Sequence, residues 1–138
     1  MSPDSPDSFS CPCGRLSAQK KPLAYAACCG RYLDHFDTVP APDAESLMRS
    51  RYTAFVRERA DYLLATWHAS QRPALLDFEP GARWLGLDVK WHRPIDDTHA
   101  EVEFVARCRG ADGRATRLQE ISRFVRENGR WYYVDQRT

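Results

Sequence analysis

The hydrophobic positions of the chain change their spacing at Pro80-Gly81, and this change separates two kinds of secondary structure. Before this point, apolar residues recur three or four positions apart, as they do on one face of a helix. Asp43 is a favourable N-cap residue, so the pattern predicts a first helix over residues 43–58 and a second from about residue 61 to residue 68. The apolar residues that define these helices are Leu47, Tyr52, Phe55 and Val56 in the first and Leu63, Leu64 and Trp67 in the second.

Beyond this point, apolar and polar residues alternate, which is typical of strands with one buried face. The alternating segments are residues 85–91 and 99–109. Asp112-Gly113 and Asn128-Gly129 are dipeptides favoured in two-residue type I′ turns, so residues 99–136 are predicted to form three antiparallel strands. Helices that precede strands in this way indicate an α+β fold, with the helices on one face of the sheet.

Turns of two residues also predict which side chains share a face of the sheet. With such turns, Arg123 opposes Val102 on one neighbouring strand and Val134 on the other. Arg123 is then the one charge on the helix-facing side, where a guanidinium needs a partner or a wet cavity. The residues predicted to face the helices are Val102, Phe104, Ala106, Ile121, Val125, Tyr132 and Val134; those predicted to face outward are Glu101, Glu103, Glu120, Ser122, Phe124, Trp131 and Tyr133.

Composition narrows the class of protein. A chain of 138 residues with 43% hydrophobic content is predicted to form one domain with a small appendage. The formal net charge of +1 argues against general coating of nucleic acid, although residues 107–138 hold eight bases and four acids, a net charge of +4. No apolar run is long enough to span a bilayer, and the first ten residues are too polar for a secretory signal. We therefore expect a cytoplasmic protein with no membrane association.

The clustering of cysteines is the strongest chemical signal. Cys11-Pro12-Cys13 and Cys28-Cys29 place four of the five cysteines within nineteen positions, whereas Cys108 stands alone. In a reducing compartment such a group is more typical of a metal site than of disulfides, and four thiolates suit Zn²⁺. Zinc bound by Cys11, Cys13, Cys28 and Cys29 is therefore predicted, with His35 as an alternative to Cys29. Oxidative pairing, or burial of free thiols without a metal, is the other interpretation.

The same residues resemble known sequences. Cys11-Pro12-Cys13-Gly14 followed by Cys28-Cys29-Gly30 is similar to the SEC-C zinc motif, with a longer loop of fourteen residues between the two pairs. Segments through the rest of the chain resemble the bacterial YchJ family, which has no established biochemical activity. This resemblance implies a SEC-C segment with its linker over residues 1–42 and a nuclear-transport-factor-2-like (NTF2-like) α+β domain over residues 43–138. The segments that carry it are residues 47–55, 61–68, 84–87, 122–124 and 131–135.

Two hypotheses for function follow. The first is a non-enzymatic binding or adaptor protein whose zinc-ordered segment presents a surface to a macromolecular partner. The related motif in the SecA family contacts acidic partner proteins and the ribosome, which is an analogy only. The bases around the cysteines favour such partners; they are Arg15, Lys20, Lys21 and Arg31.

The second hypothesis is a cavity for a small ligand or for catalysis, as NTF2-like domains enclose. It is centred on Arg123 and His68 and lined also by Tyr52, Trp67 and Trp91. The structural alternative is that Glu58 or Asp61 neutralises Arg123 while the aromatic residues fill the core. The sequence contains no recognisable catalytic constellation, so no catalytic residue is assigned. The oligomeric state stays open, because the aromatic residues predicted to face outward suit either a second copy or the N-terminal segment.

Overall fold

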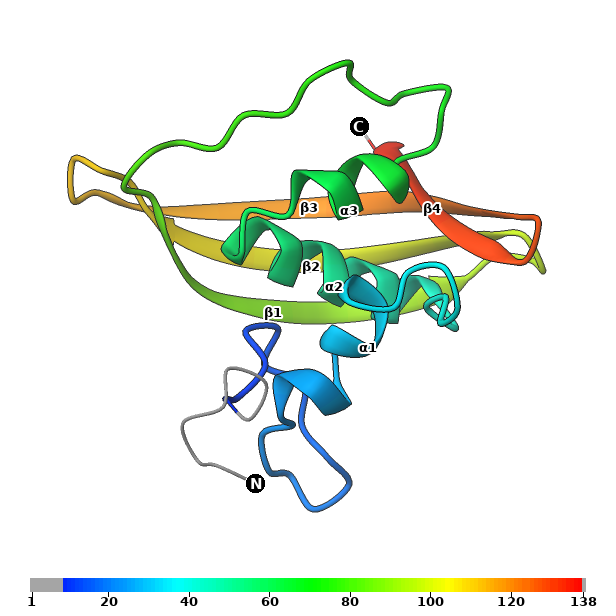
Figure 1. Cartoon of the computed structure of the whole chain (residues 1–138), viewed down its shortest axis with the longest axis horizontal. Helices are drawn as coiled ribbons and strands as arrows, with labels where there is room; N and C mark the ends of the chain where they lie inside the picture. The colour runs from blue at the N-terminus through cyan, green and yellow to red at the C-terminus, as the bar shows by residue number, and fades with distance from the viewer. Residues whose placement is uncertain (1–8, 138) are drawn as a thin grey trace.

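The structure, a computed structural model, describes residues 9–137 and consists of helices packed on one antiparallel sheet (Figure 1). The sheet has four strands in the order β1-β2-β3-β4. The predicted α+β class is therefore correct. Among the described residues, no helix combines the length and apolar character needed to cross a bilayer. The elements in chain order are the 3₁₀ helix η2 (Tyr25–Ala27), helices α1 (Gly30–Leu33), α2 (Ala44–Val56) and α3 (Ala60–Ala65), and strands β1 (Arg83–Pro94), β2 (His99–Arg109), β3 (Ala115–Glu127) and β4 (Arg130–Gln136).

Helix α2 is the central helix of the fold. It begins where the sequence predicts, because the Asp43 carboxylate accepts a hydrogen bond from the backbone N–H of Ser46 at 2.7 Å. Its apolar side, which includes Leu47 and Ala54, is buried and contacts strands of the sheet. Figure 1 shows α2 and α3 over the same face of the sheet, as the predicted layer order requires.

Helix α3 ends three residues earlier than predicted, because the chain after it pairs with strand β4. The backbone N–H of Tyr133 donates to the carbonyl oxygen of Thr66 at 2.8 Å, and the N–H of His68 donates to the carbonyl oxygen of Tyr133 at 2.7 Å. Strand pairing thus replaces the last helical turn. It places Trp67 against the Tyr133 ring, with ring centroids 5.3 Å apart.

The two predicted turns differ in length. Asn128 and Gly129 both have positive φ, 53° and 79°, and join strands in which Val125 opposes Tyr132, as predicted. The other loop contains Ala111 as well as Asp112-Gly113, and only Gly113 has positive φ, 86°. The N–H of Gly110 donates to the carbonyl oxygen of Arg114 at 2.9 Å and closes this three-residue loop.

The longer loop shifts the register of β3 on β2 by one residue, so the predicted faces of β3 are exchanged. Arg123 opposes Glu101 and not Val102, and its side chain points to the outer face. On β4, a bulge between Arg123 and Phe124 leaves Val134 as the extra residue, so Arg123 opposes Asp135.

Val102, Phe104 and Ala106 face the helices as predicted. Five residues predicted to face outward share this inner face, Glu120, Ser122, Phe124, Trp131 and Tyr133, whereas Ile121, Val125 and Tyr132 lie on the outer face.

The N-terminal segment joins the core of the α+β layers. In Figure 1 it lies beside helix α2 at the β1 side of the sheet. Its four buried cysteines and Tyr25 form one continuous apolar cluster with Leu47 and Met48 of α2. The segment has little regular structure of its own, because η2 and α1 contain three and four residues.

Candidate metal centre and cavity

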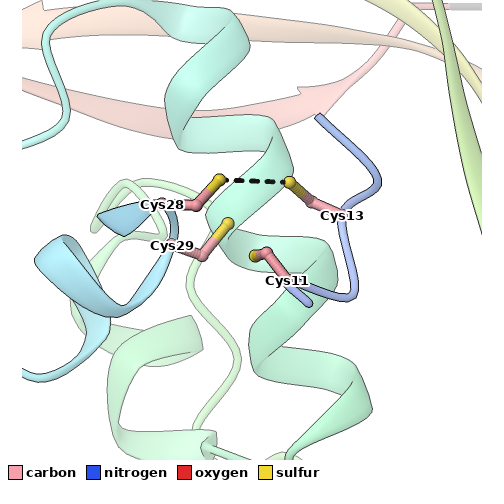
Figure 2. Close-up of side chains that lie close together, drawn as sticks. All are labelled: Cys11, Cys13, Cys28 and Cys29. Atoms are coloured by element: carbon pink, nitrogen blue, oxygen red, sulfur yellow. Dashed lines mark hydrogen bonds between the residues drawn. The ribbon is translucent and has the colours of Figure 1, made fainter. Parts of the chain in front are cut away.

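The four cysteines of the N-terminal segment lie together against helix α2 (Figure 2). Cys11 and Cys13 come from a tight turn that ends at Gly14, whose φ is 75°, and Cys28 and Cys29 join η2 to α1. All four Sγ atoms lie within 4.8 Å of one another, and each side chain is buried. The fourth member of the group is Cys29, since His35 is exposed and lies outside it.

Helix α2 supplies the polar contacts that hold this turn. The Nη1 atom of Arg49 donates to the carbonyl oxygen of Cys13 at 3.1 Å, and Arg15 donates to Oγ of Ser46 at 2.9 Å. On the other side, the N–H of Cys11 donates to the carbonyl oxygen of Leu23 at 2.8 Å. The cysteine pairs are therefore positioned by the helix as well as by their own loops.

Gly30, directly after Cys29, is required by close packing. A Cβ atom at this position would lie 2.7 Å from the ring of Tyr25 and 2.8 Å from its carbonyl oxygen. Tyr25 is fully buried, and the guanidinium of Arg57 lies 4.4 Å from its ring centroid. Only glycine allows the backbone after the second cysteine pair to approach Tyr25 this closely.

The cluster has the dimensions of a tetrahedral thiolate site. The Sγ atoms of Cys13 and Cys28 are 3.6 Å apart, and all five cysteines of the chain are free. A disulfide requires an S–S distance of about 2.05 Å. A tetrahedron with Zn–S bonds of about 2.3 Å has S–S edges of about 3.8 Å. The geometry and the donor set therefore fit Zn²⁺.

Ionisation of the four thiols is strongly coupled. Hydrogen bonds from Cys13, Cys28 and Cys29 lower the pKa of the Cys11 thiol well below its usual value. Hydrogen bonds with Cys11 and then Cys13 raise the pKa of both Cys28 and Cys29. The hydrogen bond with Cys11 raises the pKa of Cys13, but those with Cys28 and Cys29 lower it, to about 7 in all. Ionisation is thus favoured at the first cysteine pair and opposed at the second, because further negative charges would repel one another at this short range. A divalent cation at the centre would remove that repulsion.

A cavity of about 300 Å³ lies between α2 and the inner face of the sheet. Of the five residues predicted to line it, Tyr52 and Trp67 do so. Trp91 does not, because it opposes Glu103 on the outer face. His68 does not either: its Nε2 contacts a carboxylate oxygen of Glu127 at 3.0 Å.

Arg123, the predicted centre of the cavity, is also outside it. Its Nε and Nη2 atoms each donate to a carboxylate oxygen of Asp135 at 2.6 Å, and half of its side chain is exposed. The predicted partners Glu58 and Asp61 are not involved. The error follows from the one-residue register shift, which moved Arg123 to the outer face.

The buried arginine is Arg51 of helix α2, which lies in the cavity wall. Its guanidinium carbon contacts two aromatic rings, lying 5.0 Å from the centroid of Trp67 and 4.7 Å from that of Tyr133. Burial lowers the pKa of Arg51 to about 10, so it stays protonated at neutral pH. The sequence does carry a signal for this residue, because Arg51 lies four positions after Leu47 and four before Phe55, on the apolar side of the predicted helix.

Glu120 of β3 brings a second charged group to the same cavity. Its carboxylate accepts hydrogen bonds from Oγ of Ser122 and, at 3.3 Å, from the hydroxyl of Tyr133. The sequence pattern predicts Glu120, Ser122 and Tyr133 on the outer face, and this prediction is wrong because of the register shift of β3. The cavity therefore holds one guanidinium and one carboxylate among aromatic side chains.

Known proteins share this combination of elements. The model of the YchJ middle NTF2-like domain matches residues 43–136. A UPF0225 protein of a Polaromonas species is 73% identical over 125 residues, which cover 91% of this chain and 90% of that protein. A UPF0225 protein of Xanthomonas campestris is 51% identical over 139 residues, covering 99% of this chain and all of that protein.

Solved structures agree with the sequence matches. The crystal structure of a SEC-C motif-containing protein from Psychrobacter arcticus has a TM-score of 0.77 and 34% identity, covering 94% of this chain and 82% of that one. The solution structure of a SEC-C motif-containing protein from Rhodopseudomonas palustris also has a TM-score of 0.77, with 31% identity over 94% of this chain and 98% of that one. The fold is thus an NTF2-like α+β layer joined to a four-cysteine segment. The chain belongs to the YchJ family, as the sequence resemblance predicted.

Proposed function

We propose that the four cysteines bind one Zn²⁺ and that the ordered N-terminal segment, residues 9–33, is a non-enzymatic binding module for a macromolecular partner. The observation that carries the proposal is the buried group of four Sγ atoms within 4.8 Å of one another. Zinc held by four thiolates is typically structural, because no coordination position is open for a substrate. A reducing compartment such as the cytoplasm would keep the thiols available for the metal.

The charge of the segment favours an acidic partner. Residues 9–33 contain four bases and no Asp or Glu. A Zn²⁺ ion with four thiolates carries a charge of −2, so these bases leave the metal-bound segment with a net charge of +2. Lys20 and Lys21 are exposed beside Leu16, an apolar side chain that is 52% exposed. An apolar contact with a basic rim is a suitable surface for an acidic protein.

Metal binding is tested by native mass spectrometry and elemental analysis of reduced full-length protein supplied with Zn²⁺. The expected result is one zinc ion per chain in the wild type and in Cys108→Ser, the matched cysteine outside the cluster. Cys13→Ser should lose the metal, because its Sγ atom belongs to the group. Reduced wild-type protein that binds no zinc would refute the proposal.

Partner binding is tested by chemical cross-linking, with zinc-loaded protein as the bait. Lys20→Glu/Lys21→Glu should retain zinc and lose cross-linked partners, because the charge of the exposed surface is reversed. Lys90→Glu reverses the remaining lysine of the chain, on strand β1, and should recover the same partners as the wild type. If all three proteins recover the same partners, the surface around Lys20 and Lys21 is not the partner-binding surface. A normal zinc content in the same experiment would show that this failure does not concern the metal site.

A further inference from the structure

Arg51 is a buried charge with unused donors. Its Nη1 atom donates to the carbonyl oxygen of Leu63 at 2.8 Å and to Oγ1 of Thr66 at 2.7 Å. Within residues 9–137 its Nε and Nη2 atoms make no hydrogen bond and the guanidinium forms no ion pair, although the residue is only 6% exposed. The Glu120 carboxylate in the same cavity attracts this charge but forms no ion pair with it within the described residues, so Nε and Nη2 have no acceptor, which is costly for a buried guanidinium. The edge formed by Nε and Nη2 is the one that binds a carboxylate through two parallel hydrogen bonds.

Trp67, whose side chain lines the same cavity, carries a second unused donor. Its indole Nε1 is buried and has no hydrogen-bond partner among the described residues. The guanidinium carbon of Arg51 lies over its ring, 5.0 Å from the centroid, so both residues line the same end of the cavity. Buried polar groups in native proteins are nearly always satisfied by protein, water or ligand. Donors are therefore in excess at this end of the cavity, and an acceptor is missing.

The rest of the cavity is mostly apolar. The Trp84 ring makes edge contacts with Tyr52 at a centroid distance of 5.6 Å and packs on Phe55 at 5.9 Å. Leu118 also lines the cavity and is 45% exposed, so it lies at the rim. A volume of about 300 Å³ is at the lower end of the range for small-molecule sites. An aromatic ring with a short polar substituent suits these walls.

We propose that this cavity binds a small aromatic monocarboxylate, whose carboxylate accepts hydrogen bonds from Nε and Nη2 of Arg51 and from Nε1 of Trp67. The aromatic body lies among Tyr52, Phe55 and Trp84. Glu120 limits the ligand to one negative charge, because its carboxylate in the same cavity repels a second negative group on the ligand. This site is separate from the cysteine cluster and goes beyond the proposed zinc-dependent function.

The test uses three probes that share one ring and differ in the polar group: phenylacetate, phenylacetamide and phenethylamine. Each is titrated into zinc-loaded full-length protein, with affinity measured by calorimetry and contacts by ¹⁵N NMR. Phenylacetate should bind about tenfold more tightly than phenylacetamide, since charge-assisted bonds are the stronger ones. It should also shift the Nε–Hε signal of Arg51 and the amide signals of Ala106 and Ser122. Preferred binding of phenethylamine, or no binding by phenylacetate at millimolar concentration, would overturn the proposal.

Two variants and a control distinguish an effect on ligand recognition from an effect on the stability of the protein. Trp67→Phe removes a donor that has no partner within the described residues, so it should fold normally and bind phenylacetate several-fold more weakly. Arg51→Lys keeps the charge but removes the planar donor edge, whereas Arg123→Lys makes the same change on the outer face. Only Arg51→Lys should weaken binding. If Trp67→Phe is folded and binds phenylacetate as the wild type does, the indole N–H is not a ligand contact and the proposed site is wrong.

Discussion

Arg49 of helix α2 joins the helix directly to the cysteine turn, because its Nη1 atom donates to the carbonyl oxygen of Cys13 at 3.1 Å. The Nε atom of the same guanidinium donates to Glu45 at 2.9 Å, which holds the side chain against the helix. Two residues further along, Arg51 turns toward the aromatic cavity. One helix therefore positions both the four-cysteine cluster and the cavity, on different faces.

Replacing Arg49 with Met should loosen the metal centre without removing a ligand. The substitution leaves the carbonyl of Cys13 without its charged donor, and a hydrogen bond to a charged group contributes about 1.5–3 kcal/mol. We expect a stability loss at the low end of this range, since the side chain is partly exposed, and faster transfer of zinc to a competing chelator. Glu45→Gln is the control, because it keeps the hydrogen bond to Cys13. An unchanged rate of zinc release in Arg49→Met would show that this contact does not support the centre.

Removing the metal should unfold the N-terminal segment before the sheet. Residues 9–33 contain only η2 and α1, which are too short to be stable helices alone. On addition of a chelator under reducing conditions, ¹⁵N NMR should show loss of dispersion for residues 9–33 while the signals of β2 and β3 persist. Cys108→Ser should respond like the wild type. Simultaneous loss of both sets of signals would show that the segment and the sheet unfold as one unit.

The sequence predicted the elements better than the contacts between strands. Helix α2 and strand β2 were correct to within two residues, since an N-cap and strict periodicity define them. The faces of β3 were wrong, because Asp112-Gly113 forms part of a three-residue loop and a shift of one residue exchanges the faces. Both faces of β3 contain apolar side chains, so the alternation itself did not reveal the error.

The two candidate sites differed in how far they could be predicted. Cysteine spacing alone indicated the group that the structure brings together, because those residue types have few other uses in that pattern. The cavity depends on register, which local patterns do not determine. Arg123 was therefore chosen as the cavity arginine, although the four-residue spacing of Leu47, Arg51 and Phe55 already indicated Arg51.

The glycines of the two hairpin loops should contribute to stability through their backbone conformation. Gly113 and Gly129 have φ of 86° and 79°, and a side chain at either position would meet no neighbouring atom within 4 Å. Substitution by Ala therefore tests conformation alone and should cost about 1 kcal/mol at each position. Urea unfolding measures both. Gly113→Asn and Gly129→Asn serve as the controls, because Asn adopts positive φ more readily than Ala, and an equal loss for the Asn and Ala variants would contradict the assignment of strain to the turn conformation.

Thr66 links the buried guanidinium to helix α3 and provides a test of that contact. Its hydroxyl accepts from Nη1 of Arg51 at 2.7 Å and donates to the carbonyl oxygen of Tyr62 at 2.8 Å, and the residue is 3% exposed. The hydroxyl also contacts the carbonyl oxygen of Leu63 at 3.3 Å. Thr66→Val keeps the shape of the side chain and removes all three contacts, which should lower stability by about 1–3 kcal/mol. Thr116→Val, on an exposed part of β3, is the matched control and should change stability little.

A double-mutant cycle assigns the loss to the contact with Arg51. In an Arg51→Met background the hydroxyl of Thr66 has no guanidinium to satisfy, so Thr66→Val should cost less than in the wild type. The difference should be at least about 0.5 kcal/mol, which is typical of residues in direct contact. Equal costs in the two backgrounds, measured by urea unfolding, would mean that the Thr66 hydroxyl stabilises the fold through the carbonyl groups of α3 and not through Arg51.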